Sequence, residues 1–276
     1  MELSPSQKES FYKNGFLIID NFYTERELND FKEAYRKLII SSLKKAQLNS
    51  QFNLEDYLGK EFDDGMMKLE EIDHSYVADI YNTTFQMPEF LRLVGKSETT
   101  SCINQLLNKS SNEPLYTFTC RCRIDPPSGQ LRSTKWHQEV FYTIPDSNFV
   151  QTWAPLFNDA TKENGSISVC VGSHKEGIAM QSYDPESDDA NPFIIDKTLI
   201  QKYTQQVVEM KVGQIMIFNS RLFHKSGNNQ SGKIRYTLIG MYHDIDNVKF
   251  KPAKISFDFQ KKPEEYYQEI FNIIEK

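Results

Sequence analysis

LYTFTCRCRI, residues 115–124, marks the point at which the sequence changes character. The segment alternates and is rich in β-branched and aromatic residues, which is typical of a β-strand. Turn-forming residues follow at 126–129, and further strand-like segments come after them: TKWHQEVFYT (134–143), FVQTWAPLF (149–157), GSISVCVG (165–172), QQVVEMKVG (205–213), QIMIF (214–218) and KIRYTLIGMYH (233–243). Closely spaced strands without intervening helices predict an antiparallel sandwich or barrel.

The residues before 113 have a different pattern. Thr24 precedes Glu27 in a capping-box spacing, and apolar residues then recur at helical intervals along 25–46. We expect this amphipathic helix to pack on the sheet, and further helices at 69–82 and 88–95. The fold class is therefore α+β, in one domain spanning 1–276. It comprises a helix-rich part (1–112), a strand-rich core (113–250) and a C-terminal extension (251–276).

Composition excludes several classes of function. The formal net charge is −6 and the lysines are scattered among acidic residues, which argues against a nucleic-acid partner. We expect no membrane partner, because no apolar run approaches the length of a membrane span. The start has no apolar secretion signal, and the four cysteines form no disulfide framework, so we expect a cytoplasmic protein with reduced thiols. The acidic segment 184–189 is interpreted as a solvated loop.

WHQE, residues 136–139, is the first candidate for chemistry. If this segment is a strand, His137 and Glu139 project to one face and Gln138 to the other. A divalent metal needs a further ligand, and His224 is the best candidate because Ser226 and Arg235 follow it. A buried arginine requires an anionic partner, and its planar fork suits a carboxylate. Two histidines and one carboxylate are the ligand set of non-haem Fe(II) oxygenases.

WHQE, TWAPL (152–156), ENGSISVCVGSHK (163–175) and the group His224, Ser226 and Arg235 together resemble the phytanoyl-CoA dioxygenase family. The opening FYKNGFLIIDNFYTERELNDF (11–31) is similar to that family as well, so the resemblance covers nearly the whole chain. It implies a double-stranded β-helix, or jelly roll, flanked by N-terminal helices. It also implies an enzyme that uses Fe(II), 2-oxoglutarate and O2 to hydroxylate a small molecule, releasing succinate and CO2.

Carried over by position, the resemblance implies roles for individual residues. His137, Glu139 and His224 match the iron ligands and thus the catalytic centre. Arg235 and Ser226 match the groups that hold the distal carboxylate of 2-oxoglutarate, and Trp153 borders that site. A further basic contact falls on Arg121 or Arg123, of which we select Arg123.

One position departs from the family pattern, which usually has Asp where this chain has Glu139. Glu keeps the negative charge and adds one methylene, and its presence argues against halogenation, which needs that ligand position free. Two other functions use the same three ligands. One is a metal-binding jelly roll that acts as a sensor or scaffold, and the other is a zinc hydrolase, because two His and one Glu also form a catalytic zinc set.

Overall fold

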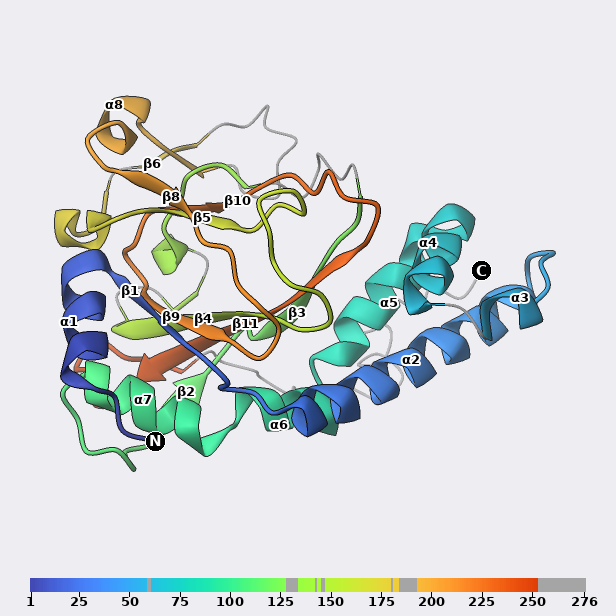
Figure 1. The fold of residues 1–276 in the computed structure, drawn as a ribbon, viewed down its shortest axis with the longest axis horizontal. Helices are drawn as coiled ribbons and strands as arrows, with labels where there is room; N and C mark the ends of the chain where they lie inside the picture. The colour runs from blue at the N-terminus through green and yellow to red at the C-terminus, as the bar shows by residue number, and fades with distance from the viewer. Residues whose placement is uncertain are drawn as a thin grey trace, which may run out of the picture.

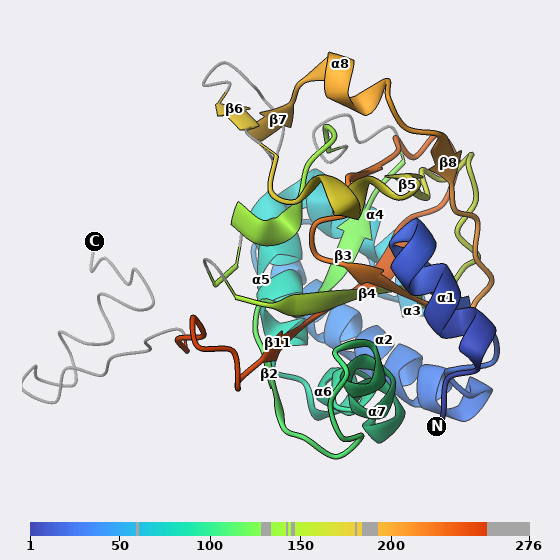
Figure 2. The same cartoon turned by 90° about the vertical axis from the view of Figure 1, so that its left-hand side faces the viewer.

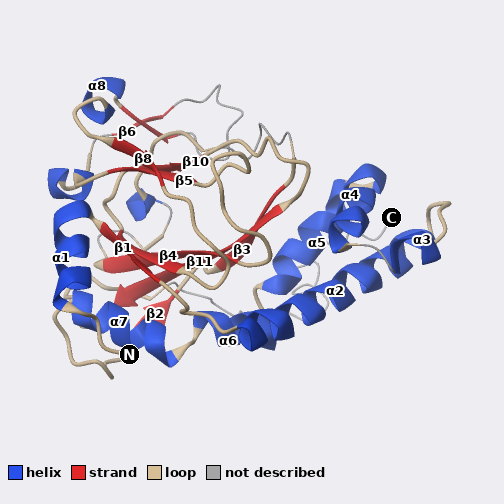
Figure 3. Cartoon of the chain, in the orientation of Figure 1, coloured by secondary structure: helices blue, strands red, loops and turns tan. Residues whose placement is uncertain are grey.

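The computed structural model describes residues 1–58, 61–127, 134–141, 143–144, 147–179, 181–183 and 193–252. Helices dominate the first part: α1 (Pro5–Asn14), α2 (Glu25–Gln47), α3 (Glu55–Leu58), α4 (Phe62–Ile72), α5 (His74–Thr84), α6 (Pro88–Val94) and α7 (Ser97–Leu106), with the short strand β1 (Phe16–Ile19) between the first two. Strands dominate from Leu115 onward, as the sequence predicts (Figure 3).

The strands form two antiparallel sheets and a small hairpin. The larger sheet has the order β1, β9 (Ile215–Asn219), β4 (Phe149–Pro155), β11 (Arg235–Asp244) and β2 (Leu115–Thr117), with β3 (Arg121–Asp125) also paired to β11. The smaller sheet has the order β10 (His224–Ser226), β5 (Ile167–Cys170) and β8 (Gln205–Val207). The hairpin joins β6 (Gln181–Tyr183) to β7 (Phe193–Ile195), and α8 (Lys197–Ile200) follows it. Figure 1 shows the smaller sheet lying over one face of the larger sheet.

The larger sheet is covered on both faces, and its residues divide by strand parity. On β4, Val150 and Ala154 pack with the helices in one core, whereas Phe149 and Trp153 belong to a second core between the two sheets. Figure 2 shows α2, α6 and α7 on the opposite side of the larger sheet from β5 and β8. Because alternate residues of a strand face opposite sides, one set of residues packs against the helices and the other set against the smaller sheet.

The long helix α2 begins at the predicted capping box. The Thr24 side chain accepts from the backbone N of Glu27, and the Glu27 side chain in turn accepts from the backbone N of Thr24. A correction applies to 69–82, predicted as one helix: α4 ends at Ile72 and α5 begins at His74. Asp73 is extended and its side chain accepts from the backbone N of Ser75, so it starts a new helix there.

The segment 134–143 is a second correction, because its described residues do not form a strand. His137 makes a single antiparallel bridge to His224, and a 3-10 turn follows at Glu139–Phe141. The segment 205–213 is strand only at β8. The acidic segment 184–189 and the part of the extension from 253 to 276 lie outside the described residues. Among the described residues, no helix is both long and apolar enough to cross a bilayer.

Candidate active site

His137 and His224 lie side by side because the main chain couples them. The backbone N of each donates to the carbonyl of the other, at 3.0 and 3.1 Å, and the ring centroids are 4.3 Å apart. His137 comes from the bridge before the 3-10 turn, and His224 opens β10 of the smaller sheet. Two residues distant in sequence thus present their rings at one point between the sheets.

Both imidazoles are held in one tautomer. Nδ1 of His137 donates to the carbonyl of Lys135 at 2.8 Å, and Nδ1 of His224 donates to the carbonyl of Leu222 at 2.9 Å. A carbonyl oxygen only accepts, so Nδ1 of each ring carries a proton and Nε2 is the ring atom that can bind a metal. Metal-binding histidines are usually oriented by such a contact on the other ring nitrogen. Burial and the neighbouring His224 lower the pKa of His137, which favours the neutral form.

Glu139 completes the cluster. Its Oε2 lies 3.6 Å from Nε2 of His137 and 3.8 Å from Nε2 of His224, and all three residues are buried. Potential ligand atoms of the three residues lie within 4.8 Å of one another. The side chains converge as predicted, although the bridge and the 3-10 turn bring them together instead of a strand. Burial alone would raise the pKa of Glu139, but His137, His224 and Arg121 outweigh burial and hold the pKa well below its ordinary range.

Gln138, between the two, points away from the cluster. Its Nε2 donates to the carbonyls of Gly177 and Arg221 at 2.7 and 2.6 Å, and its Oε1 accepts from the backbone N of Ala179 at 3.0 Å. Gln138 therefore fixes the backbone between His137 and Glu139 to two neighbouring loops. This buried anchor keeps the flanking side chains in place.

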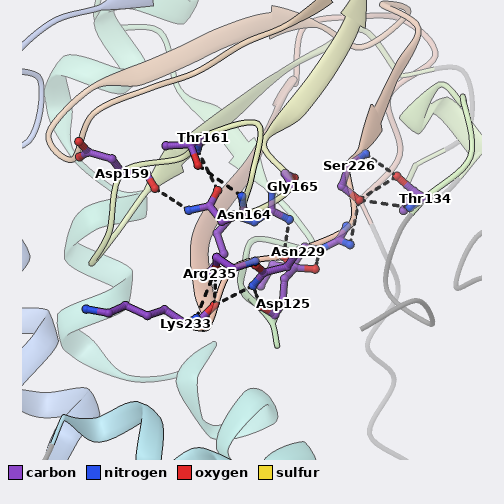
Figure 4. Close-up of polar contacts among 12 residues, drawn as sticks. Asp125, Thr134, Asp159, Thr161, Asn164, Gly165, Ser226, Asn229, Lys233 and Arg235 are labelled. Carbon is purple, nitrogen blue, oxygen red and sulfur yellow. Dashed lines mark hydrogen bonds and ion pairs between the residues drawn. The ribbon is translucent and has the colours of Figure 1, made fainter. Parts of the chain in front are cut away.

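A second polar group lies along β3 and β11. Arg123 Nε donates to Asp125 Oδ1 at 2.8 Å, and Arg123 Nη2 donates to Ser226 Oγ at 3.0 Å. Arg235 Nη2 donates to Asp125 Oδ2 at 2.8 Å, and its Nη1 donates to the carbonyl of Gly165 (Figure 4). Asp125 thus bridges two guanidinium groups.

This arrangement shows that the protein itself supplies the anionic partner of the buried Arg235. Arg235 is 1% exposed, and its anionic partner is the internal Asp125. Burial alone would raise the pKa of Asp125, but Arg123 and Arg235 outweigh it and lower that pKa below its ordinary value. The burial of Arg235 therefore does not by itself require an external dicarboxylate. The prediction that Arg235 contacts a co-substrate stays a prediction.

The three-residue cluster opens into a cavity of about 380 Å³. The predicted residues Arg123, Trp153 and Ser226 line it, and so does Arg121. Arg121 and Arg123 are two residues apart on β3 and share a face, so both candidates point into the cavity. Arg235 lies behind this wall, with its guanidinium carbon 5.8 Å from the centroid of the Trp153 ring.

Several residues that line the cavity were not predicted from the sequence. One wall comes from α5 through His74, Val77, Ala78 and Tyr81, and other parts come from Thr134, Gln151 and Phe218. On α5, Val77 reads as an ordinary buried helix residue, and no local pattern marks the helix as part of a site. The spacing that predicts an amphipathic helix does not indicate which part of the fold its apolar face will pack against.

The remaining histidines have other environments. His74 is exposed beside Glu70 at the start of α5, near the capping Asp73, as expected. Nε2 of His174 donates to the carbonyl of Tyr12 at 3.2 Å, which fits the structural role predicted for it. His243 is buried in β11 and bonds Thr143 and Ser147.

The donor set fits a divalent first-row metal. Two imidazoles whose Nδ1 atoms donate to backbone carbonyls and one carboxylate face a common point, and a cavity lies beside it. In a layered antiparallel fold, two His and one carboxylate beside an open cavity are typical of the class of mononuclear iron oxygenases. The sequence profile of the phytanoyl-CoA dioxygenase (PhyH) family matches residues 11–237. The chain belongs to this family and is therefore a dioxygenase.

Curated relatives agree with the family. A probable phytanoyl-CoA dioxygenase of Caenorhabditis elegans is 22% identical over 251 residues, covering 90% of this chain and 78% of the relative. The phytanoyl-CoA dioxygenase of Arabidopsis thaliana is 23% identical over 290 residues, covering 96% and 97%. The bovine peroxisomal phytanoyl-CoA dioxygenase is 23% identical over 252 residues, covering 88% and 69%.

Solved structures share the fold at low identity. EctD from S. alaskensis, crystallised with 2-oxoglutarate and 5-hydroxyectoine, has a TM-score of 0.60 at 17% identity, covering 89% of this chain and 77% of EctD. The epimerase SnoN, in complex with Fe3+, alpha ketoglutarate and nogalamycin RO, has a TM-score of 0.59 at 14% identity, covering 87% and 82%. These similarities confirm the α+β jelly-roll fold, whose two sheets remain open here.

Proposed function

We propose that this protein is an Fe(II)- and 2-oxoglutarate-dependent oxygenase that hydroxylates a small molecule and releases succinate and CO2. The observation that carries the proposal is the buried cluster of His137, Glu139 and His224 beside a cavity with a basic wall. Family membership and structural relatives crystallised with iron and 2-oxoglutarate support it. The three residues would hold iron through Nε2, Oε2 and Nε2.

The iron, when bound with 2-oxoglutarate and O2, supplies the oxidising power for attack on a carbon–hydrogen bond. The chain's own residues bind, orient and exclude water. Glu139 offsets the metal charge, and both histidines are already held in the tautomer that binding needs. Ile167, Phe218 and Ile239 line the cavity with apolar surface, which keeps water from the reacting groups.

The basic wall is assigned to the co-substrate. Arg123 and Ser226 line the cavity and bond each other, and Thr134 Oγ1 lies 3.1 Å from Ser226 Oγ. A distal carboxylate placed there would meet a guanidinium and two hydroxyls, while Trp153 borders it. Arg235 adds charge from behind Asp125. With Asp125 ionised, the two guanidiniums and this carboxylate sum to one positive charge, which matches one carboxylate.

The alternatives use the same metal ligands but differ at this wall. A zinc hydrolase or a metal-binding scaffold does not need cationic groups lining the cavity beside the metal. The basic wall therefore favours the oxygenase. We also propose one catalytic domain, because helix α5 and the strands line the same cavity. A cytoplasmic location stays a proposal, which the four free cysteines support.

The test compares metals and co-substrates in the purified protein. Without oxygen, Fe(II) and 2-oxoglutarate together should give a weak visible absorption band that neither gives alone. With oxygen and a panel of small metabolites, succinate should form only when Fe(II) and 2-oxoglutarate are both present. Tight binding of zinc, with no band and no succinate for any iron-loaded sample, would refute the oxygenase assignment.

A further inference from the structure

The two carboxylate oxygens of Glu139 have different partners. Oε2 faces Nε2 of His137 and of His224, at 3.6 and 3.8 Å. Oε1 accepts from Nη2 of Arg121 at 3.1 Å and so points to β3. The carboxylate is 6% exposed and the Arg121 side chain 31% exposed, so the contact lies at the cavity wall. One oxygen is thus directed at the metal position and the other is held by an arginine.

Arg121 is separate from the co-substrate wall. Arg123, two residues along β3, bonds Asp125 and Ser226, whereas the contact described for Arg121 is with Glu139. β3 is hydrogen-bonded to β11, with Arg121 opposite Ile239, so its backbone belongs to the larger sheet. Glu139, in contrast, leaves from a 3-10 turn outside the sheets. The ion pair therefore ties the Glu139 carboxylate to the larger sheet.

The longer side chain of Glu139 is the reason that a contact with Arg121 is needed to hold its carboxylate in place. Glu has one more rotatable bond than Asp, and fixing that bond costs conformational free energy. A longer, unrestrained carboxylate can also turn both oxygens toward the metal and fill a position that the co-substrate needs. A partner on Oε1 opposes both effects. Residues that hydrogen-bond a ligating carboxylate commonly have this function.

We propose that Arg121 is a positioning residue that holds Glu139 as a one-oxygen ligand and so keeps a metal position open for 2-oxoglutarate. This inference rests on the proposed function. Arg121 acts through Glu139, in contrast to Arg123, which is assigned to the co-substrate itself. The contact between Arg121 and Glu139 explains how this chain can use Glu where Asp is the usual residue of the family that it resembles.

The experiment measures binding without turnover, under argon. In Arg121→Gln, the dissociation constant of 2-oxoglutarate for the Fe(II) protein should rise by about 10–100-fold, with a displaced or lost visible band. Fe(II) affinity should change less, because removing a nearby positive charge offsets the lost ordering. Arg121→Lys keeps one donor and the charge, so it should recover part of the parent's 2-oxoglutarate affinity and band. Thermal melts establish that each variant is folded.

Glu139→Asp separates positioning from direct attraction of the co-substrate. The Asp carboxylate ends about 1.5 Å nearer the backbone and cannot reach both Arg121 and the metal. Adding Arg121→Gln to Glu139→Asp should therefore change 2-oxoglutarate binding little. An equal loss in both backgrounds would mean that Arg121 attracts the co-substrate directly, and parent-like binding in Arg121→Gln would also overturn the inference. Absence of the band in the parent protein would instead contradict the proposed function.

Discussion

Arg235 and Asp125 form an ion pair in the interior, with Nη2 2.8 Å from Oδ2 and side chains that are 1% and 5% exposed. Arg123 bonds the same carboxylate. Three charged groups are thus buried or half-buried together, and each depends on the others. Removing one partner of such a group leaves an uncompensated charge, which is far more destabilising than the absence of the whole group.

Asp125→Asn should destabilise the fold strongly. The substitution leaves Arg123 and Arg235 facing each other without the carboxylate that separates them. We expect the free energy of unfolding to fall by about 3–5 kcal/mol, measured by urea denaturation. Glu89→Gln is the matched control, because Glu89 pairs with Arg92 on an exposed helix surface. That control should lose less than about 1 kcal/mol. Equal losses in the two variants would contradict the importance of the buried pair.

Arg123→Leu and Arg235→Leu should both weaken 2-oxoglutarate binding far more than iron binding. For Arg123, loss of a desolvated charge-assisted contact should cost about 2–5 kcal/mol. The loss at Arg235, which lies behind Asp125, should be smaller. Titration of 2-oxoglutarate into the Fe(II) protein measures the effect, and Arg92→Leu, an exposed arginine, is the control. An unchanged dissociation constant in Arg235→Leu alone would make Arg235 a structural partner of Asp125. Unchanged values in both variants would remove the basic wall as the carboxylate site.

Substitutions of Glu139 should follow the order Glu, then Asp, then Ala in both iron affinity and succinate formation. Ala removes one ligand and the negative charge, so we expect activity to be lost. Asp keeps the charge on an arm that is one methylene shorter than the Glu that this pocket holds, and a misplacement of about 1 Å can cost about 100-fold in rate. Glu163→Ala, at an exposed turn, is the control. Parent-like iron binding and turnover in Glu139→Ala would place the carboxylate ligand elsewhere.

His243 should make the fold sensitive to mild acid. Burial lowers the pKa of His243 to about 4, whereas an unfolded chain has it near its ordinary 6.5. As the pH falls between these values, the unfolded state takes up a proton that the folded state does not, so stability declines. In His243→Gln, the loss of unfolding free energy between about pH 7.5 and about pH 5 should be smaller than in the parent. A pH dependence in His243→Gln as large as the parent's would contradict this role for His243.

Strand parity accounts for what the sequence predicts well. Strand-like composition identifies β4, β9 and β11, and strand parity places Arg121 and Arg123 on one face of β3. It fails at 134–143, where the predicted strand is one bridge followed by a 3-10 turn. There the pairing with His224 and the anchoring of Gln138 override local propensity, and both depend on residues far away in sequence.

The partner of Arg235 could not be predicted from the sequence either. A buried arginine requires an anion, but the sequence does not reveal that Asp125, on another strand, supplies it. For the same reason the α5 wall was not predicted, because only the three-dimensional arrangement brings Val77 and Tyr81 to the cavity that Trp153 also lines. Residue types and spacing identify His137, Glu139 and His224, which the structure brings together, whereas contacts between distant segments determine the shape of the cavity.

The position of α5 at the cavity has a consequence for how substrate selectivity can change on this fold. The groups assigned to metal and co-substrate all come from residues 121–235, whereas His74, Val77, Ala78 and Tyr81 come from a helix encoded well before them. Asp73 starts that helix independently of α4 through its own cap. Substituting the residues of α5 that line the cavity should therefore change which molecules enter it, while His137, Glu139 and His224 keep their positions. Laboratory evolution of new substrates should begin there.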